Sequence, residues 1–375
     1  MRILHIVEAS FAGVGRHVQD LAEWQQKSHE VTVIYGSNRC SSGFLARTLE
    51  MPAVNWVPVE TSRFVSAKDW KSFQLCRKKI ADFKPDVVHG HSSKGGVLAR
   101  LCANPDQSRI IYTPNAIYTM NPELSTFMRF AVSTVETRLS KRTHCIIAVS
   151  PEERSHLLKL TIDPSRIAMV PNGIGEIGEF RKNQVRNDLG LPPDNLVMGF
   201  VGRLDRQKSP DALIDVYTKL SSEVKQPVTL AIVGEGPMGD EMREAVRENG
   251  FNQDQIRFLG YQDGPKSMAA FDMFVLPSRY EGFPYVLIEA AATGLPIVTT
   301  VEANASQIVL DGKNGFVRAF GDSEGLAMAI SKLLCDVELR DLFSVNARDI
   351  AKSFTLDNMC RKTQDVYQKQ GGLLN

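Results

Sequence analysis

The chain has 375 residues, of which 43% are hydrophobic and 23% charged, a composition that suits a folded globular protein and excludes a disordered, collagen-like or nucleic-acid-coating chain. This length exceeds what one hydrophobic core usually serves, so we expect two domains with a cleft between them. The six cysteines are far apart and form no C-x-x-C pair, which argues against a zinc site and against a disulfide framework and favours a reducing cytoplasm.

The net charge of +1 hides a division between the two halves of the chain. Residues 1–172 carry 22 Lys and Arg against 15 Asp and Glu, whereas residues 173–375 carry 22 against 28, so the halves are +7 and −6. A basic first half suits an anionic partner, such as a phospholipid surface or a pyrophosphate-bearing acceptor, but two facing domains of complementary charge would show the same asymmetry. The apolar run of MRILHIVEAS breaks at Glu8 and is shorter than a signal peptide requires, and no run of 18 apolar residues occurs, so we expect any membrane contact to be peripheral.

In the first half, short apolar runs typical of strands alternate with segments of helical period. The expected strands are ILHIV, VTVIYG, DVVHGH, RIIYT, HCIIAVS and RIAMVP. The expected helices cover about Gly15–Gln26, the region near Leu98, Pro122–Ser140 and the segment after Pro151. Near-continuous apolar strands predict a parallel sheet that is covered on both faces.

The alternation pauses at residues 171–195, a stretch rich in Gly, Asn and charge, where we place the domain boundary. A first domain of residues 1–172 and a second of residues 173–355 follow. The last segment, about Leu356 to Gly371, is expected to complete the first domain.

The second half repeats the pattern, with expected strands LVMGFVGR, VTLAIVG, QIRFLG, FDMFVLPS and LPIVTT. Helices are expected over Pro210–Leu220, from about Pro237, from near Pro284 and twice after Asp322. Two doubly wound sheets of this kind would leave an inter-domain groove suited to a nucleotide. An NAD-dependent dehydrogenase is disfavoured, because Val18 stands where the third glycine of G-x-G-x-x-G would follow the first strand.

The strongest chemical signal is the segment PSRYEGFPYVLIEAAATGLPIV. Glu281 and Glu289 flank a turn into a helix, with Pro284 expected at the first helical position. The backbone N–H groups of residues 282–286 would then face an anion, and Glu289 would project toward the same end. This pattern predicts a diphosphate site beside an acceptor of hydroxyl groups. The alternative is an amphipathic helix with two solvated glutamates.

Two further motifs support a phosphate site. In FVGRLDRQKSPDALI a strand ends at Gly202 and Arg203, and Lys208 precedes a helix for which Ser209 is the expected cap. A guanidinium and an ammonium group together would stabilise the charge of a departing diphosphate, although surface charge is a plain alternative. In VGEGP, two glycines after a strand would permit close approach of the backbone to a nucleotide.

Taken together, these motifs resemble the retaining glycosyltransferases of family 4, α/β enzymes with the GT-B fold of two facing Rossmann-like domains. The resemblance runs from Met1 to about Leu356 and includes ATGLPIV and the segment DGKNGFV near residues 311–317. It implies that Arg203 and Lys208 hold the donor diphosphate, with Glu281 facing the sugar. Glu289 would take the ribose hydroxyls, and the strand around Arg257 and Phe258 would be the base-binding edge.

The full set of implied residues is as follows. The catalytic residues would be Glu281, Arg203, Lys208 and His91. The donor-binding residues would be Gly13, Gly15, Gly202, Gly234, Gly236, Arg257, Phe258, Gly282, Phe283, Pro284, Tyr285 and Glu289. The acceptor-binding residues would be Arg16, His91 and Asn115. A histidine at a strand end such as His91 is, however, more often a packed structural residue.

The sequence departs from the family pattern at three places. Asn115 stands where many relatives carry a histidine, and an amide can donate a hydrogen bond to a sugar but cannot act as a base. Gln307 replaces a frequent glutamate, and Ala12 with Gly13 replaces a common Gly-Gly pair. These changes concern the sugar and acceptor ends more than the phosphate contacts.

The resemblance implies transfer of a hexose or N-acetylhexosamine, with retention, from a nucleotide-sugar donor, with UDP favoured. The acceptor would be a saccharide or lipid-linked saccharide in cell-surface polysaccharide or lipopolysaccharide synthesis, at the cytoplasmic side of a membrane. No two aspartates lie two apart, so we expect no metal requirement; no cofactor and no nucleic-acid partner is expected either. A nucleotide-sugar epimerase or a non-catalytic nucleotide-sugar binder of the same fold remains the alternative.

Overall fold

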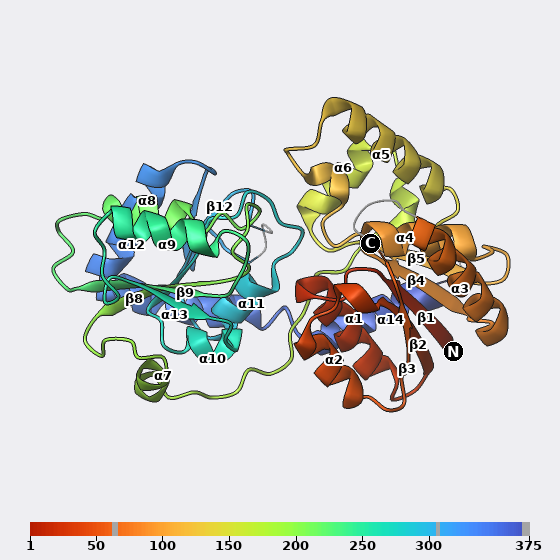
Figure 1. Cartoon of the computed structure of the whole chain (residues 1–375), viewed down its shortest axis with the longest axis horizontal. Coiled ribbons are helices and arrows are strands. Elements are labelled where there is room, and N and C mark those ends of the chain that lie inside the picture. Colours follow the sequence, from red (N-terminus) through yellow and green to blue (C-terminus); the bar gives the residue numbers. More distant parts are fainter. Residues whose placement is uncertain (62–66, 305–307, 370–375) are drawn as a thin grey trace. The chain divides into compact units, whose positions relative to one another are not determined.

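The computed structural model describes residues 1–61, 67–304 and 308–369. The chain forms two compact units (Figure 1). One contains Met1–Asn172 and the C-terminal helix, and the other contains Gly173–Thr355. Within the described ranges, no helix is both long enough and apolar enough to cross a membrane.

The first unit is built on a seven-stranded sheet. Its strands are β1 (Arg2–Val7), β2 (Glu30–Gly36), β3 (Asn55–Val59), β4 (Val87–His91), β5 (Arg109–Thr113), β6 (Cys145–Ala148) and β7 (Ile167–Met169). Its helices are α1 (Ala12–Gln25), α2 (Ser42–Leu49), α3 (Ala67–Phe83), α4 (Ser92–Cys102), α5 (Thr126–Ser140), α6 (Pro151–Lys159) and α14 (Leu356–Gln368), with short 3-10 turns at Ser37–Arg39, Tyr118–Met120 and Pro164–Arg166. All strand pairs are parallel, in the order β3-β2-β1-β4-β5-β6-β7.

Helices cover both faces of this sheet, as near-continuous apolar strands predict. On one face, Leu21 of α1 and Val366 of α14 pack with Ile3 and Ile111. On the other face, Cys76 of α3 packs with residues of α4 and of β1, β2, β4 and β5. The C-terminal helix therefore completes the core of the first unit, and α1 and α14 are neighbours there.

The second unit is built on a six-stranded sheet. Its strands are β8 (Leu196–Val201), β9 (Val228–Val233), β10 (Ile256–Gly260), β11 (Met273–Leu276), β12 (Ile297–Thr300) and β13 (Gly315–Arg318). Its helices are α7 (Lys182–Asp188), α8 (Ala212–Thr218), α9 (Gly239–Glu248), α10 (Gly264–Met268), α11 (Tyr285–Ala292), α12 (Ser323–Cys335) and α13 (Val337–Ala351). The strands are again all parallel, in the order β10-β9-β8-β11-β12-β13. The predicted class, two α/β units with parallel sheets, is confirmed.

Each sheet has a switch point where the strand order reverses. In the first sheet it lies between β1 and β4, and in the second between β8 and β11. At such a point the two loops that leave the carboxyl ends of the strands run to opposite faces of the sheet, which opens a crevice where ligands of this architecture usually bind. The motifs after β8 and β11 and the motifs after β1 and β4 are therefore placed at the two crevices by topology.

Several element boundaries differ from the sequence-based expectation. Helix α1 begins at Ala12, three residues before the predicted start. Helix α5 begins at Thr126 instead of Pro122, because the hydroxyl of Ser125 accepts a hydrogen bond from the backbone N–H of Met128 and caps the helix there. Helix α8 begins at Ala212, and its cap is Asp211 instead of the predicted Ser209, which has a positive φ of 46°.

Other elements have no counterpart in the expectation, namely α2, α3, α7, α10, β3 and β13. Helix α7 lies inside the stretch of residues 171–195 where we expected the domain boundary. Its buried Arg186 donates to the carbonyl oxygens of Ala270 and Pro193 and pairs with Asp272 at 2.7 Å. The helix is therefore fixed by contacts with residues about 85 positions away, which local sequence patterns do not reveal.

Candidate active site at the switch point of the second sheet

The loops after β8 and β11 are joined by backbone and side-chain hydrogen bonds. The carbonyl oxygen of Gln207 accepts from the backbone N–H of Arg279 at 2.8 Å, and its side-chain amide donates to the carbonyl oxygen of Tyr280 at 3.2 Å. These two bonds hold the loop that contains Arg203 and Lys208 (the GRL motif) against the segment that contains Glu281 and Glu289, which are eight residues apart (the E-x7-E motif). The sequence analysis did not single out Gln207, although it lies within the motif that contains Arg203 and Lys208.

Lys208 and Glu281 form an ion pair across these two loops. The Lys208 Nζ lies 2.6 Å from Glu281 Oε1, and the side chains are 19% and 9% exposed. Asp205, also missed, accepts from the backbone N–H of Lys208 at 3.1 Å, and its other carboxylate oxygen lies 3.5 Å from Arg203 Nε. Arg203 itself is 52% exposed at the same loop. Lys208 has three N–H donors, of which Glu281 takes one among the described residues, and the other two can donate to an anion.

The E-x7-E helix starts one residue later than predicted. Pro284 is the N-cap of α11 and not its first helical residue, while Phe283 and Tyr285 are buried. Glu289 is buried too, and a Cβ added at Gly264 would lie 3.6 Å from its Oε2. The second glutamate of the motif therefore lies beside the start of α10, at the loop that follows β10.

The glycines of the GRL and VGEGP motifs are required by packing within the protein. A Cβ on Gly234, whose φ is +129°, would lie 1.9 Å from the carbonyl oxygen of Gly202. A Cβ on Gly236 would lie 2.3 Å from the carbonyl oxygen of Leu204. Only glycine permits this contact between the loops after β8 and β9. In this structure the two glycines allow the backbone of the loop after β9 to pack closely against the backbone of the loop after β8.

The predicted base-binding edge borders a cavity of about 950 Å³ along β10, which α7, α9 and α10 also line. Arg257 and Phe258 line it, but Arg203, Lys208 and Glu281 do not. The Arg257 guanidinium donates to the carbonyl oxygens of Gly190 and of Gln253, so it fixes neighbouring chain segments. The side chain of Arg257 thus has a structural role here, and a base contact at this edge would fall to the backbone.

In the first unit, Gly13, Gly15 and Arg16 lie in the first turns of α1 and not in a loop before it. A Cβ on the buried Gly15 would lie 2.9 Å from the carbonyl carbon of Ser10, so glycine is needed for the turn that follows β1. Arg16 Nε lies 3.6 Å from the buried carboxylate of Asp20. These residues are grouped at the carboxyl end of β1, next to the switch point.

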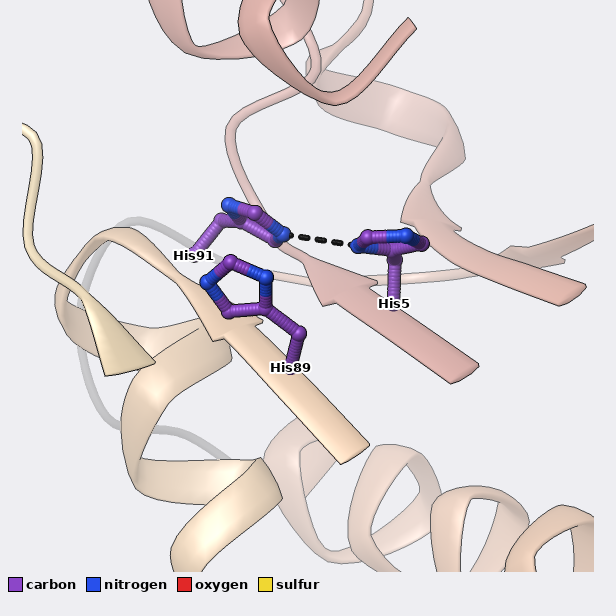
Figure 2. Close-up of side chains that lie close together, drawn as sticks. All are labelled: His5, His89 and His91. Atoms are coloured by element: carbon purple, nitrogen blue, oxygen red, sulfur yellow. Dashed lines mark hydrogen bonds between the residues drawn. The ribbon is translucent and has the colours of Figure 1, made fainter. Parts of the chain in front are cut away.

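His91 ends β4 and is fully buried in a cluster of imidazole rings (Figure 2). Its Nε2 lies 2.9 Å from Nδ1 of His5, and its ring centroid lies 3.9 Å from that of His89. Burial lowers the pKa of His5 to about 4 and lowers the pKa of His91 well below its usual value. The rings are therefore neutral near pH 7. The His91 ring has no exposed surface in this structure, and its catalytic role stays a prediction.

The remaining nitrogen atoms of this cluster bind polar side chains of the same unit. His5 Nε2 lies 2.7 Å from Oε1 of Gln25. His89 is bonded on one side to the hydroxyl of Tyr367 at 2.6 Å and on the other to the hydroxyl of Thr113 at 2.7 Å. Tyr367 belongs to α14, so this network ties the C-terminal helix to the ends of β4 and β5.

The nitrogen atoms of His5, His89 and His91 lie within 4.8 Å of one another, close enough to consider a metal ion. Both ring nitrogens of His5 and of His89 have hydrogen-bond partners, however, and the rings of His89 and His91 are tilted by 37° with their centroids 3.9 Å apart (Figure 2). The cluster also lacks a carboxylate or thiolate to offset the charge of a buried ion. The donor set therefore fits a hydrogen-bonded network better than a metal site.

Three buried polar atoms at the carboxyl end of the first sheet lack hydrogen-bond partners within the described ranges. They are the hydroxyl of Ser10, Nδ1 of His91 and the side-chain nitrogen of Asn115. They follow or end β1, β4 and β5 respectively. Unmet hydrogen-bonding capacity in a folded protein calls for an explanation, and a polar ligand is one. Asn115 was predicted to bind the acceptor, whereas Gln307, the other notable departure from the family pattern, lies outside the described residues.

Two family models match the chain. The model described as "Glycosyltransferase Family 4" matches residues 11–175, and "Glycosyl transferases group 1" matches residues 181–350. The chain belongs to the family 4 glycosyltransferases. This glycosyltransferase has the GT-B fold, and its recognition from sequence motifs is confirmed.

Curated and solved relatives agree with this assignment. The glycosyltransferase is 29% identical over 327 residues to the UDP-Gal:α-D-GlcNAc-diphosphoundecaprenol α-1,3-galactosyltransferase of Escherichia coli, covering 83% of this chain and 82% of that protein. Its fold is similar to that of Anabaena HepE in complex with UDP and glucose, with a TM-score of 0.82, 21% identity and coverage of 97% and 98%. WaaG, a glycosyltransferase involved in lipopolysaccharide biosynthesis, matches with a TM-score of 0.78, 19% identity and coverage of 99% and 100%.

Proposed function

We propose that this glycosyltransferase transfers a hexose or N-acetylhexosamine from a UDP-sugar to a lipid-linked saccharide during synthesis of a cell-surface polysaccharide. The observation that carries the proposal is the Lys208–Glu281 pair at the switch point of the second sheet, with Arg203 on the same loop. The Escherichia coli relative uses a UDP-sugar and a saccharide on a lipid diphosphate, as its name states. HepE, which shares the fold, binds UDP and glucose.

The chemistry follows from the charge that develops on the donor. The bond between the anomeric carbon and the phosphate oxygen breaks, and the pyrophosphate of UDP gains negative charge. In this proposal Lys208 and Arg203 stabilise that charge by charge-assisted hydrogen bonds, aided by the N-terminus of α11. Glu281 orients the Lys208 ammonium, and Glu289 is the proposed partner of the ribose hydroxyls.

Retention and metal independence are further parts of the proposal. The acceptor hydroxyl attacks from the face that UDP leaves, and its proton passes to the departing phosphate oxygen as the new bond from carbon to oxygen forms. Two side-chain cations and helix amides then do what a metal ion does in other glycosyltransferases. Activity that persists in excess chelator and an α-linked product from an α-linked donor are the expected results.

Nucleotide preference is the first test. Thermal shift with UDP, GDP, ADP and CMP should show stabilisation by UDP above the others, because a ligand that binds only the folded state raises its melting temperature. Transfer is then measured with UDP-galactose, UDP-glucose and UDP-N-acetylglucosamine, using N-acetylglucosaminyl-diphosphoundecaprenol as acceptor. Preferential stabilisation by GDP would contradict the donor part of the proposal.

Glu281→Gln separates an enzyme from the alternatives. The variant should bind UDP within about threefold of the wild type and lose transfer by about 100-fold, since the amide cannot hold the Lys208 ammonium as a carboxylate does. Wild-type protein that binds UDP but transfers nothing to any acceptor would indicate a binder. Interconversion of UDP-glucose and UDP-galactose would indicate an epimerase.

The basic first unit is also proposed to contact an anionic membrane surface. Helix α5 exposes Phe127 and Phe130 to 80% and 72%, and Arg138 and Lys141 are exposed at its other end. Exposed aromatic side chains together with basic groups along one helix suit peripheral insertion at a headgroup layer.

Vesicle flotation tests this contact. The wild type should float with phosphatidylglycerol vesicles and not with phosphatidylcholine vesicles, and Phe127→Ser with Phe130→Ser should reduce the floated fraction about fivefold. Met328→Ser is the matched control, because Met328 is 73% exposed on α12 of the second unit. An equal loss in the control would argue against α5 as the membrane contact.

A further inference from the structure

The loop that follows β5 takes a path that its residues do not favour. Asn115 and Ala116 have φ values of +54° and +75°, in the left-handed region. Asparagine tolerates this region, whereas alanine is strained there, and neither residue is glycine. Such a conformation persists only where the surrounding structure imposes it, and strain of this kind gathers at binding sites.

The group that imposes this path is the carboxylate of Glu153, the third residue of α6. Glu153 is fully buried. Its Oε1 accepts hydrogen bonds from the backbone N–H groups of Ala116 at 2.9 Å and Ile117 at 3.0 Å, and its Oε2 accepts from that of Val149 at 2.9 Å. Two of these three donors belong to the strained loop, so one carboxylate oxygen fixes two successive amides.

Part of the role of Glu153 is local, because it belongs to the N-terminal cap of its own helix. Ser150 and Glu153 have the spacing of a capping box, in which the glutamate reaches back to the start of its own helix. The Ser150 hydroxyl does accept from the Glu153 backbone N–H at 3.1 Å. The Glu153 carboxylate also reaches a loop about 37 residues earlier in the chain, which a cap alone does not require.

The residue that this arrangement places is Asn115. It directly precedes the two clamped amides, at the carboxyl end of β5, and Thr113 of that strand pairs in register with His91 of β4. The Asn115 side-chain nitrogen has no partner within the described ranges. A donor held in this way is suited to a hydroxyl oxygen of a sugar.

We propose that Glu153 is a positioning residue for acceptor binding: by clamping the amides of Ala116 and Ile117 it holds the Asn115 carboxamide in the orientation that meets an acceptor hydroxyl. This inference rests on the proposed function, in which Asn115 contacts the acceptor. It adds that the affinity for the acceptor, and not for the nucleotide, depends on a buried carboxylate that touches neither.

A double-mutant cycle tests the inference. Steady-state transfer is measured for the wild type, Asn115→Ala, Glu153→Met and the double variant, with N-acetylglucosaminyl-diphosphoundecaprenol and the UDP-sugar that supports transfer. Each single variant should raise the acceptor KM about tenfold and leave the donor KM within about twofold. In the Asn115→Ala background, Glu153→Met should add less than about twofold, because it acts through the same side chain.

Ser150→Ala is the matched control for loss of stability. It removes the cap of α6 and leaves the carboxylate of Glu153 in place, so it should lower the melting temperature with the acceptor KM unchanged. A rise in both donor and acceptor KM in Glu153→Met, or an undiminished effect in the Asn115→Ala background, would overturn the positioning role.

A second measurement keeps the inference independent of catalysis. Hydrogen–deuterium exchange of the peptide that contains Ala116 and Ile117 should rise at least about tenfold in Glu153→Met, which removes both acceptor oxygens, and stay unchanged in Ser150→Ala. Unchanged exchange in Glu153→Met would refute the clamp even in a protein that shows no transfer. Failure of the proposed function would instead appear as absence of transfer in the wild type with the exchange result intact.

Discussion

The two sheets of this glycosyltransferase share a strand order and differ in the chemistry at their switch points. At the first, the groups at the ends of β4 and β5 are neutral: buried imidazoles, hydroxyls and an amide. At the second, a lysine and a glutamate form an ion pair beside a half-exposed arginine. Neutral donors and acceptors suit hydroxyl groups, whereas cations suit a pyrophosphate. Topology thus provides two equivalent crevices, and the loop residues decide what each can bind.

The largest expected effect concerns charge at the second crevice. Lys208→Ala should lower transfer by about 100- to 1,000-fold, because it removes a cation that stabilises the leaving diphosphate and leaves Glu281 unpaired. His91→Asn, at the first crevice, should cost less than about tenfold, since its ring is buried among other side chains. Lys219→Ala, which removes a lysine paired with Asp215 on α8, is the control for loss of a positive charge. Similar losses of transfer for Lys208→Ala and His91→Asn would contradict the expected difference between the two crevices.

Acid should destabilise the first unit before the second. Burial lowers the pKa values of His5 and His17 to about 4 and those of His89 and His91 well below the usual value. The unfolded chain binds these protons at about pH 6.5, so stability is complete above that pH and is lost as the pH falls toward 4.

Burial raises the pKa of Glu153 to about 7, which acts in the opposite direction, but one carboxyl does not cancel four imidazoles. We expect a net loss of about 3 kcal/mol or more between pH 6.5 and 4. Fluorescence follows the first unit, because all three tryptophans, Trp24, Trp56 and Trp70, belong to it. Urea unfolding at a series of pH values measures the loss, and a flat profile over this range would contradict neutral burial of the cluster.

Close backbone packing at the second crevice gives a smaller effect. Gly234→Ala should lower the free energy of unfolding by about 3 kcal/mol, because its Cβ would overlap the carbonyl oxygen of Gly202. Gly250→Ala shares a positive φ, +72°, but its Cβ would meet nothing within 4 Å, so a cost of about 1 kcal/mol is expected. Calorimetry of both variants separates the clash from the backbone strain, and equal costs would show that the contact with Gly202 is not limiting.

The smallest expected effect concerns Asp205. Asp205→Asn keeps an oxygen that can accept from the Lys208 backbone N–H and removes the charge that faces Arg203. Because Arg203 is half exposed, this change should alter the dissociation constant of UDP by no more than about threefold. Isothermal titration with UDP measures it. A change above tenfold would show that Asp205 controls the site more strongly than an exposed ion pair does.

Much of the fold followed from apolar periodicity. The buried strands β1, β2, β4, β5, β8 and β9 were predicted because each is a short, nearly continuous apolar run. Helix α7 was not predicted from the sequence. Its Arg186 donates hydrogen bonds to backbone carbonyl groups and pairs with Asp272, and these contacts, several of them with distant segments, leave no local sequence pattern. The start of α5 was misplaced because the cap Ser125, and not Pro122, sets it.

The sequence alone determined the identity of the charged groups at the second crevice, since Arg203, Lys208 and Glu281 follow apolar strands in recognisable motifs and strands of a parallel sheet present their carboxyl ends together. Only the tertiary structure decided that Lys208 meets Glu281, that Gly234 serves a backbone contact, and that His91 lies sealed among other imidazoles. The physical reason is that burial and pairing depend on residues distant in sequence, whose approach is set by packing of whole elements and not by any local pattern.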